Sequence, residues 1–129
     1  MRKKFDEELR HLNNLLLEMA MLNESSIKKA ISLLDEKDER VAEEVSNYEE
    51  RTDVYEGIIQ KQCLKIFVEQ QPAAGDLRRV SSALKMITDM ERIGDNARDI
   101  ADICMMLPDD YDTSRFPLIK QMAESTIDL

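Results

Sequence analysis

A row of carboxylates in one short segment is the feature of this sequence that most clearly offers chemistry. The segment DMERIGDNARDIAD, from Asp89 to Asp102, contains five carboxylates, and only Arg92 and Arg98 balance their charge. It has no proline and a single glycine, so it is predicted to be helical. These acids form either a solvated helix face or a binding site.

Helix geometry divides the acids of this segment into a row and an outlier. At about 100° per residue, Asp89 points about 160° away from Glu91 and leaves the row. The remaining acids share one face: Glu91, Asp95, Asp99 and Asp102. An apolar stripe on another side is predicted to hold this helix to its neighbours: Met90, Ile93, Ala97, Ile100 and Cys104. The acid row can therefore face outwards or lie along a seam between helices.

A second group of acids occurs earlier in the chain, at Glu49, Glu50, Asp53 and Glu56. Glu49–Asp53 and Glu91–Asp95 have the same spacing of four, which places the two side chains of each pair about 6 Å apart on one helix face. Folding the chain back at QQPAAGD brings three pairs to the same level: Asp53 with Asp95, Glu56 with Glu91, and Glu49 with Asp99.

Two facing rows of carboxylates repel each other unless a cation lies between them or some of the acids stay protonated. Their hard oxygen atoms suit Mg, Mn, Fe or Ca, whereas the lack of nearby His disfavours Zn and a ferritin-like di-iron centre. The candidate metal ligands are Glu49, Asp53, Glu56, Glu91, Asp95 and Asp99. Two alternatives remain. The acids form a solvated helix face, or their charge is neutralised within the protein by Arg51, Arg92 or Arg98, and Arg92 is the arginine favoured for this role.

Three long helices must position these acids, because apolar residues recur at alternating steps of three and four over residues 5–34, 39–69 and 77–106. Asp35 or Asp38 is expected to cap the second helix, and Asp76 the third. Two alternatives are a break of the first helix near Asn23 and Ser26, and a kink at Pro72 in place of a turn.

The short turns predict an all-α fold, an up-down-up antiparallel three-helix bundle over residues 1–106. Residues 107–129 are predicted to be a linker and the truncated first helix of another unit, with Ser114 capping a helix that begins near Phe116 or Pro117. Cys63 and Cys104 are expected in the core. Tyr48 and Tyr55 are expected to pack where neighbouring helices of the bundle meet.

The composition indicates which kinds of ligand the chain can bind and which cellular compartment it occupies. The chain has 129 residues and a net charge of −9, which disfavours nucleic acid and anionic lipid as ligands and suits cations. The start, MRKKFDEELR, has no apolar run after its basic residues, so neither a signal peptide nor a membrane span is expected. Two Cys without a CxxC motif fit a reducing cytosol.

Three stretches of the chain together resemble the PhoU family: FDEELRHLNNLLLEM, CLKIF and QQPAAGDLRRVSSALKMITDMERIGDNARDIA. The resemblance covers about Met1 to Met106, one three-helix repeat. It implies a cytoplasmic negative regulator of phosphate uptake and of the phosphate-starvation response, acting between the phosphate ABC transporter ATPase and its sensor histidine kinase. Some members of this family bind iron or zinc clusters through E(D)xxxD motifs, which correspond here to Glu91 and Asp95 and to Glu49, Asp53 and Glu56.

The chain departs from the family pattern at two positions and in length. Glu49 stands where Asp is frequent, and Asn96 stands where His is frequent, which removes a possible nitrogen ligand. The family has two tandem repeats, so the chain is expected to be a fragment or a short form that completes itself as a homodimer. The other functional hypotheses are a carboxylate-bridged metalloenzyme and a metal-free helical adaptor; no catalytic Ser-His or Cys-His pattern is present.

Overall fold

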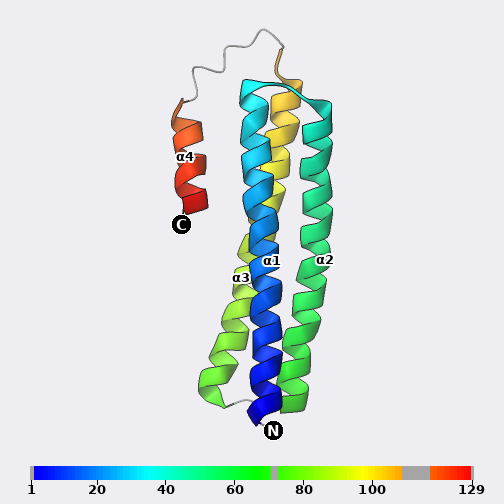
Figure 1. Ribbon diagram of the computed structural model, residues 1–129, viewed down its shortest axis with the longest axis vertical. Helices are drawn as coiled ribbons and strands as arrows, with labels where there is room; N and C mark the ends of the chain where they lie inside the picture. The colour runs from blue at the N-terminus through cyan, green and yellow to red at the C-terminus, as the bar shows by residue number, and fades with distance from the viewer. Residues whose placement is uncertain (1, 71–72, 109–116, 129) are drawn as a thin grey trace.

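The computed structural model describes residues 2–70, 73–108 and 117–128, and this part of the chain is helical without a strand. Its helices are α1 (Arg2–Asp35), α2 (Glu39–Gln70), α3 (Ala74–Met106) and α4 (Pro117–Asp128). The first three pack side by side in the predicted up-down-up antiparallel bundle, and α4 lies beside the upper half of α1 (Figure 1). None of the described helices is long and apolar enough to cross a membrane.

The helix boundaries confirm most of the predicted helix starts and turns, and one predicted capping residue is wrong. α1 continues through Asn23 and Ser26, and α2 and α3 are separate helices. The carboxylate of Asp38 caps α2 by accepting a hydrogen bond from the backbone N–H of Arg40 at 2.9 Å. The prediction that Asp76 caps α3 is wrong. The predicted cap Ser114, and Pro72 and Phe116, lie outside the described part of the chain.

The N-cap of α3 is Ala73, which makes no side-chain capping hydrogen bond. The helix begins at Ala74, three residues earlier than predicted. Its first backbone hydrogen bond runs from the N–H of Leu77 to the carbonyl of Ala73 at 2.8 Å. Asp76 instead lies in the first turn, where its negative charge interacts favourably with the helix dipole.

The core is divided along the bundle axis into two hydrophobic clusters. The lower cluster includes Met19, Ile59, Cys63, Ile66 and Ile87, and the upper one includes Ala30, Leu33, Val45, Ala97 and Cys104. Between them lies a layer of small or polar buried residues: Asn23, Ser26, Thr52 and Gly94. Both cysteines are buried, as expected, and are free thiols.

The stripe predicted to attach the third helix is only partly correct. Ile93 and Ile100 remain 36% exposed, while the buried face of α3 consists largely of smaller residues: Val80, Ala83, Ile87, Gly94, Ala97, Ala101 and Cys104. The small buried residues let α3 pack closely against both α1 and α2, and the two larger isoleucines lie beside this face in a pocket that α4 also lines.

The fourth helix rests on the surface of the bundle. It has no buried residue, it contacts α1, and Lys120 forms an ion pair with Asp35 at the end of α1. The start of this helix at Pro117 agrees with the predicted boundary. Its assignment, with the linker, to a second repeat stays a prediction.

Candidate functional site between α2 and α3

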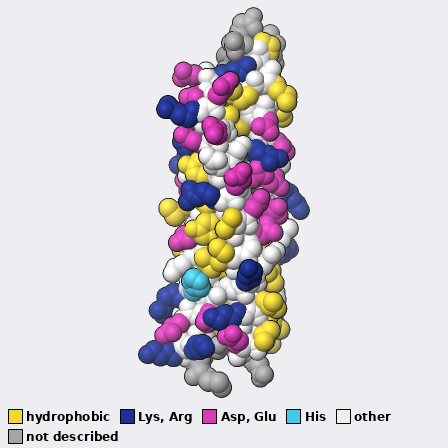
Figure 2. Space-filling model, turned by 90° about the vertical axis from the view of Figure 1, so that its right-hand side faces the viewer, with side chains coloured by type: hydrophobic (Ala, Val, Ile, Leu, Met, Phe, Trp, Pro, Cys, Tyr) yellow, Lys and Arg dark blue, Asp and Glu magenta, His cyan; other side chains and the backbone are white. Residues whose placement is uncertain are grey.

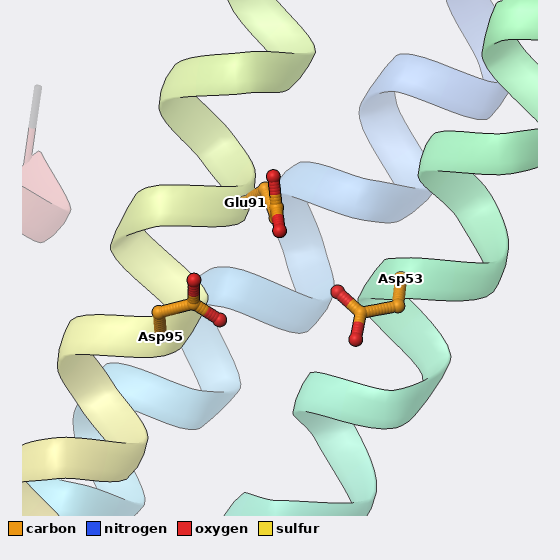
Figure 3. A group of neighbouring side chains, drawn as sticks. All are labelled: Asp53, Glu91 and Asp95. Carbon is orange, nitrogen blue, oxygen red and sulfur yellow. The ribbon is translucent and has the colours of Figure 1, made fainter.

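Three carboxylates meet at the middle of the bundle. Asp53 of α2 and Glu91 and Asp95 of α3 each offer an oxygen atom, and these atoms lie within 4.8 Å of one another. Figure 3 shows Asp53 reaching across from α2 towards the two acids of α3. Oxygen atoms bound to one hard cation at about 2.0–2.6 Å lie at most about 5 Å apart, so this group could hold a single ion with small side-chain movements.

The polar layer of the core explains why the acids come together at this height. The amide Nδ2 of Asn23 donates a hydrogen bond to the carbonyl of Met90 at 2.9 Å, which ties α1 to α3. Gly94 faces Asn23 and Thr52, and a Cβ atom at this position would lie 3.4 Å from the Oδ1 of Asn23. Since α3 presents only a hydrogen here, it approaches α1 and α2 closely and carries Glu91 and Asp95 towards Asp53.

Glu49 extends the group on the upper side and is itself neutralised by an arginine. Its side chain is buried and forms an ion pair with Arg98. Nη1 of Arg98 lies 2.7 Å from Oε2 of Glu49. The pKa of Glu49 is raised from 4.5 to about 7, first by burial and then by a hydrogen bond with the carboxyl group of Asp95, while the charge of Arg98 acts in the opposite direction.

Glu56 extends the group on the lower side, one turn before the acids of α3. Its pKa is raised from 4.5 to about 7 by burial, by a hydrogen bond with Glu91 and by the negative charges of Glu91 and Asp53. Its Oε2 atom is buried, and no N–H or O–H group among the described residues donates to it when the carboxyl groups of Glu56 and Glu91 are both ionised. The pKa of Asp53 is raised by burial and by the charges of Glu91 and Asp95. We call Glu49, Asp53, Glu56, Glu91 and Asp95 the acidic seam.

The acidic seam is chemically suited to a hard cation. Its carboxyl groups lie close enough to share protons, which is how carboxylates at such distances avoid mutual repulsion when no cation is present. The buried Oε2 of Glu56 is a further ligand atom at the edge of the group, since no donor group among the described residues bonds to it. Oxygen-only donors favour Mg, Mn, Ca or Fe over Zn. Figure 2 shows acidic side chains gathered midway along the α2 side of the bundle.

The structure distributes the six predicted ligands unequally. Asp53, Glu91 and Asp95 converge, Glu49 and Glu56 flank them, and Asp99 is exposed one turn further along α3, where its charge acts on Arg98. The internal neutralising role expected for Arg92 is carried by Arg98, because Arg98 lies on the side of α3 that faces Glu49.

The supporting residues of the site were not identified from the sequence. Asn23 and Ser26 were predicted only as a possible break of the first helix, and no role in the site was predicted for Thr52; all three are buried. The available signal was that all three are polar residues at core spacing. Polar residues at such positions in neighbouring helices indicate a polar layer, here at the level of the acids.

Comparison with known proteins gives consistent matches. The family model described as PhoU domain matches residues 16–104. Phosphate-specific transport system accessory protein PhoU homologs are 31% identical in Aquifex aeolicus over 94% of this chain and 34% identical in Pseudomonas putida over 88% of it. These alignments cover 55% and 44% of the two relatives, so the chain spans about half their length. No solved structure was found to match.

Proposed function

Since the chain belongs to the PhoU domain family, we propose that it is a non-catalytic negative regulator of phosphate uptake and of the phosphate-starvation response. It acts by binding, coupling the phosphate ABC transporter ATPase to its sensor histidine kinase. The names of the relatives, accessory proteins of the phosphate-specific transport system, support a place beside the transporter.

The observation that carries a specific mechanism is the convergence of Asp53, Glu91 and Asp95 from two helices. We propose that the acidic seam binds a divalent or iron cation, with Fe, Mn, Mg and Zn as the metals to test. In this proposal Glu49 and Glu56 support the central group and Asp99 extends it along α3. The ion would fix the distance between α2 and α3 and so set the shape of the surface that a partner contacts.

The proposed setting is cytoplasmic, with the protein held at the inner face of the membrane only through its partners. A homodimer is part of the proposal. Its support is the set of exposed large hydrophobic residues on α1 and α2, which includes Leu17, Met21 and Val54, each more than 60% exposed. Exposed apolar patches of this kind commonly mark interaction surfaces. Light scattering of the purified chain over a range of concentrations tests the dimer directly.

Metal binding by chelator-treated protein tests the cation site. Thermal unfolding is measured with and without Fe²⁺, Mn²⁺, Mg²⁺ and Zn²⁺ for the wild type and for the Asp53→Asn and Asp95→Asn variants. We expect stabilisation of the wild type that both variants lose while remaining helical. The matched control is Asp89→Asn, which removes an exposed acid of α3 outside the seam and should keep the effect. Stabilisation that persists in both seam variants would disprove the site.

Co-purification tests the regulatory function. The chain is expressed together with the transporter ATPase or with the sensor kinase, and the complex is isolated by a tag on the partner. Retention by either partner is expected. Absence of association with both, under conditions where the chain is folded, would count against the regulatory assignment and leave the metal result unaffected.

A carboxylate-bridged metalloenzyme is the second candidate function, because paired helices with clustered carboxylates also occur in redox enzymes. Oxygen consumption by the iron-loaded chain would favour it. A metal-free helical adaptor is the third candidate, and it is favoured if partner binding survives the Asp53→Asn and Asp95→Asn substitutions unchanged.

A further inference from the structure

The groove between α1 and α3, on the opposite side of α3 from the acidic seam, has two halves of different character. The upper half is covered by α4. Its lining is almost entirely apolar and includes Ile27, Ile31, Ile93, Ile100, Ile119 and Met122. The lower half is an open cavity of about 590 Å³. Residues of α4 therefore line the upper pocket together with α1 and α3, whereas the lower pocket is lined by α1 and α3 alone.

The lower half combines an apolar floor with a basic rim. Leu9, Leu12, Leu16, Ala83 and Met86 supply the apolar atoms. Arg10 of α1 and Arg78 and Arg79 of α3 line the same cavity, and Asp6 is the one carboxylate among its lining residues. We call this lower half the basic groove. Three positive charges against one negative charge are unusual in a chain whose net charge is −9.

The basic groove is long rather than round. Its lining residues extend from Asp6 to Leu16 on α1 and from Arg78 to Met86 on α3. At about 1.5 Å per residue, these spans correspond to roughly 12–15 Å along each helix. A small anion would contact only a fraction of this length and would gain nothing from the apolar floor. An elongated ligand with an apolar face uses both features.

The way α4 binds in the upper half indicates the kind of ligand that the lower half accepts. α4 places Ile119 and Met122 in the apolar lining of the groove, and Lys120 pairs with Asp35 on the edge of α1. A helix thus rests on this surface through apolar residues that remain partly exposed, and a charge at its margin opposes the charge on the bundle. In the basic groove the margin is positive, so the complementary margin is acidic.

We propose that the basic groove docks an amphipathic helix of a partner protein, with carboxylates flanking its apolar stripe. Helices bound in grooves are recognised through apolar anchors spaced three and four residues apart, and rim charges select the partner and its orientation. This inference uses a different pair of helices from the acidic seam. It holds whether or not the seam binds a cation and whichever regulatory partners the proposed function has.

Two synthetic helices test the proposal. Both are peptides of about 16 residues with the same leucine stripe, and a side-chain staple holds each helical because short isolated helices are marginal in water. One carries Glu on both flanks of the stripe and the other carries Lys. Affinities are measured by fluorescence anisotropy, and the binding surface is located from backbone amide NMR shifts of the isotope-labelled chain.

The Glu peptide is expected to bind at least roughly tenfold more tightly than the Lys peptide and to shift the amides of Ser82, Ala83 and Met86. Arg79→Glu should weaken the Glu peptide by about three- to tenfold. Arg10→Glu, on the other wall of the groove, repeats this test in case one variant is misfolded. Lys61→Glu makes the same charge change on the exposed surface of α2 and should alter affinity by less than about twofold.

Three results would overturn the proposal: equal affinity of the two peptides, binding of neither, or shifts confined to α2. A fourth is a change of the Ser82 and Met86 amides with the concentration of the chain alone. That result would assign the basic groove to contacts between copies of this chain instead of to a partner helix.

Discussion

Nη1 of Arg98 lies 2.7 Å from Oε2 of Glu49, so a cation carried by α3 neutralises the upper end of the acidic seam. The arginine side chain is 44% exposed, and that of Glu49 is only 10% exposed. The lower end differs, because Glu56 there faces a second carboxylate, Glu91. The seam thus has a compensated end and an end where protons or a bound cation must supply the positive charge.

Loss of the arginine should destabilise the fold most when Glu49 is charged. Arg98→Gln is expected to lower the free energy of unfolding measurably at pH 8, because the buried carboxylate of Glu49 then loses its positive partner. Urea denaturation measures the change. Arg92→Gln, an exposed arginine on the same helix, is the control and should change the stability by less than about 0.5 kcal/mol. Equal effects of the two substitutions would contradict the structural role of the pair.

The metal-free chain should become less stable as the pH rises through neutrality. Glu49 and Glu56 have pKa values raised from 4.5 to about 7. In this range the folded state keeps protons that the unfolded state has released, so the stabilising contribution is complete below about pH 4.5 and is lost as the pH rises through about 7. The expected loss is on the order of 1 kcal/mol. Urea denaturation at intervals from pH 5 to 8 measures it.

Removal of one titrating group supplies the control for this pH dependence. Glu56→Gln should flatten the decline between pH 5 and 8, because the amide cannot lose a proton. Glu43→Gln replaces an exposed glutamate of the same helix and should leave the slope as in the wild type. An unchanged slope in Glu56→Gln would show that this carboxyl group is not the source.

Neutralising a central acid should stabilise the protein in the absence of metal. Asp53 has a raised pKa because burial and the charges of Glu91 and Asp95 oppose its ionisation. Asp53→Asn is therefore expected to raise the free energy of unfolding at pH 8 in chelator, by an amount that solvent screening of this exposed side chain keeps small. Asp89→Asn should have a smaller effect. Destabilisation by Asp53→Asn would mean that its carboxylate makes a favourable interaction that outweighs the repulsion by Glu91 and Asp95.

The helical glycines should respond differently to side chains. A Cβ atom at Gly57 would meet nothing within 4 Å, so Gly57→Ala is expected to stabilise the protein by about 0.5–1 kcal/mol through helix propensity. Gly94→Val should destabilise it by about 1–3 kcal/mol, because branched methyl groups would press on Asn23 and Thr52. Thermal unfolding followed by circular dichroism distinguishes them. Tolerance of valine at Gly94 would refute the close approach of the helices.

Adjacent isoleucines on α2 test the orientation of that helix. Ile59 is fully buried and Ile58 is 42% exposed. Ile59→Ala is expected to cost about 2–5 kcal/mol, and Ile58→Ala less than about 1 kcal/mol. Urea denaturation of the two variants gives the comparison directly. A larger cost at Ile58 would require a different rotation of α2 about its axis.

Much of the fold followed from local patterns. Apolar residues at helical spacing predicted α1 to α3, and the position of the turn after α2 predicted which acids share a level. The structure has Glu56 beside Glu91, and Asp53 beside Asp95, as that register required. The cap of α3 was misassigned because Asp76 is a good capping residue by type, and side-chain preference at a helix start is weaker than the local backbone geometry.

The pairing of individual side chains within the site could not be predicted from the sequence. Glu49 was expected level with Asp99, but it bonds to Asp95 and Arg98. Axial level follows from the rise per residue, whereas the direction in which a side chain points across a seam depends on how far each helix is rotated. Gly94 and Asn23 set that rotation for α3 through contacts with residues distant in sequence.

The sequence by itself determined three helices, their antiparallel order and the height of the acids, because these depend on residue spacing and on the positions of the turns. Only the tertiary structure decided which carboxylates meet, which arginine neutralises them, and that Arg10 joins Arg78 and Arg79 around one groove. These relationships depend on the rotation and separation of packed helices. The fit of small and polar residues in the shared core sets both quantities, and no single segment encodes them.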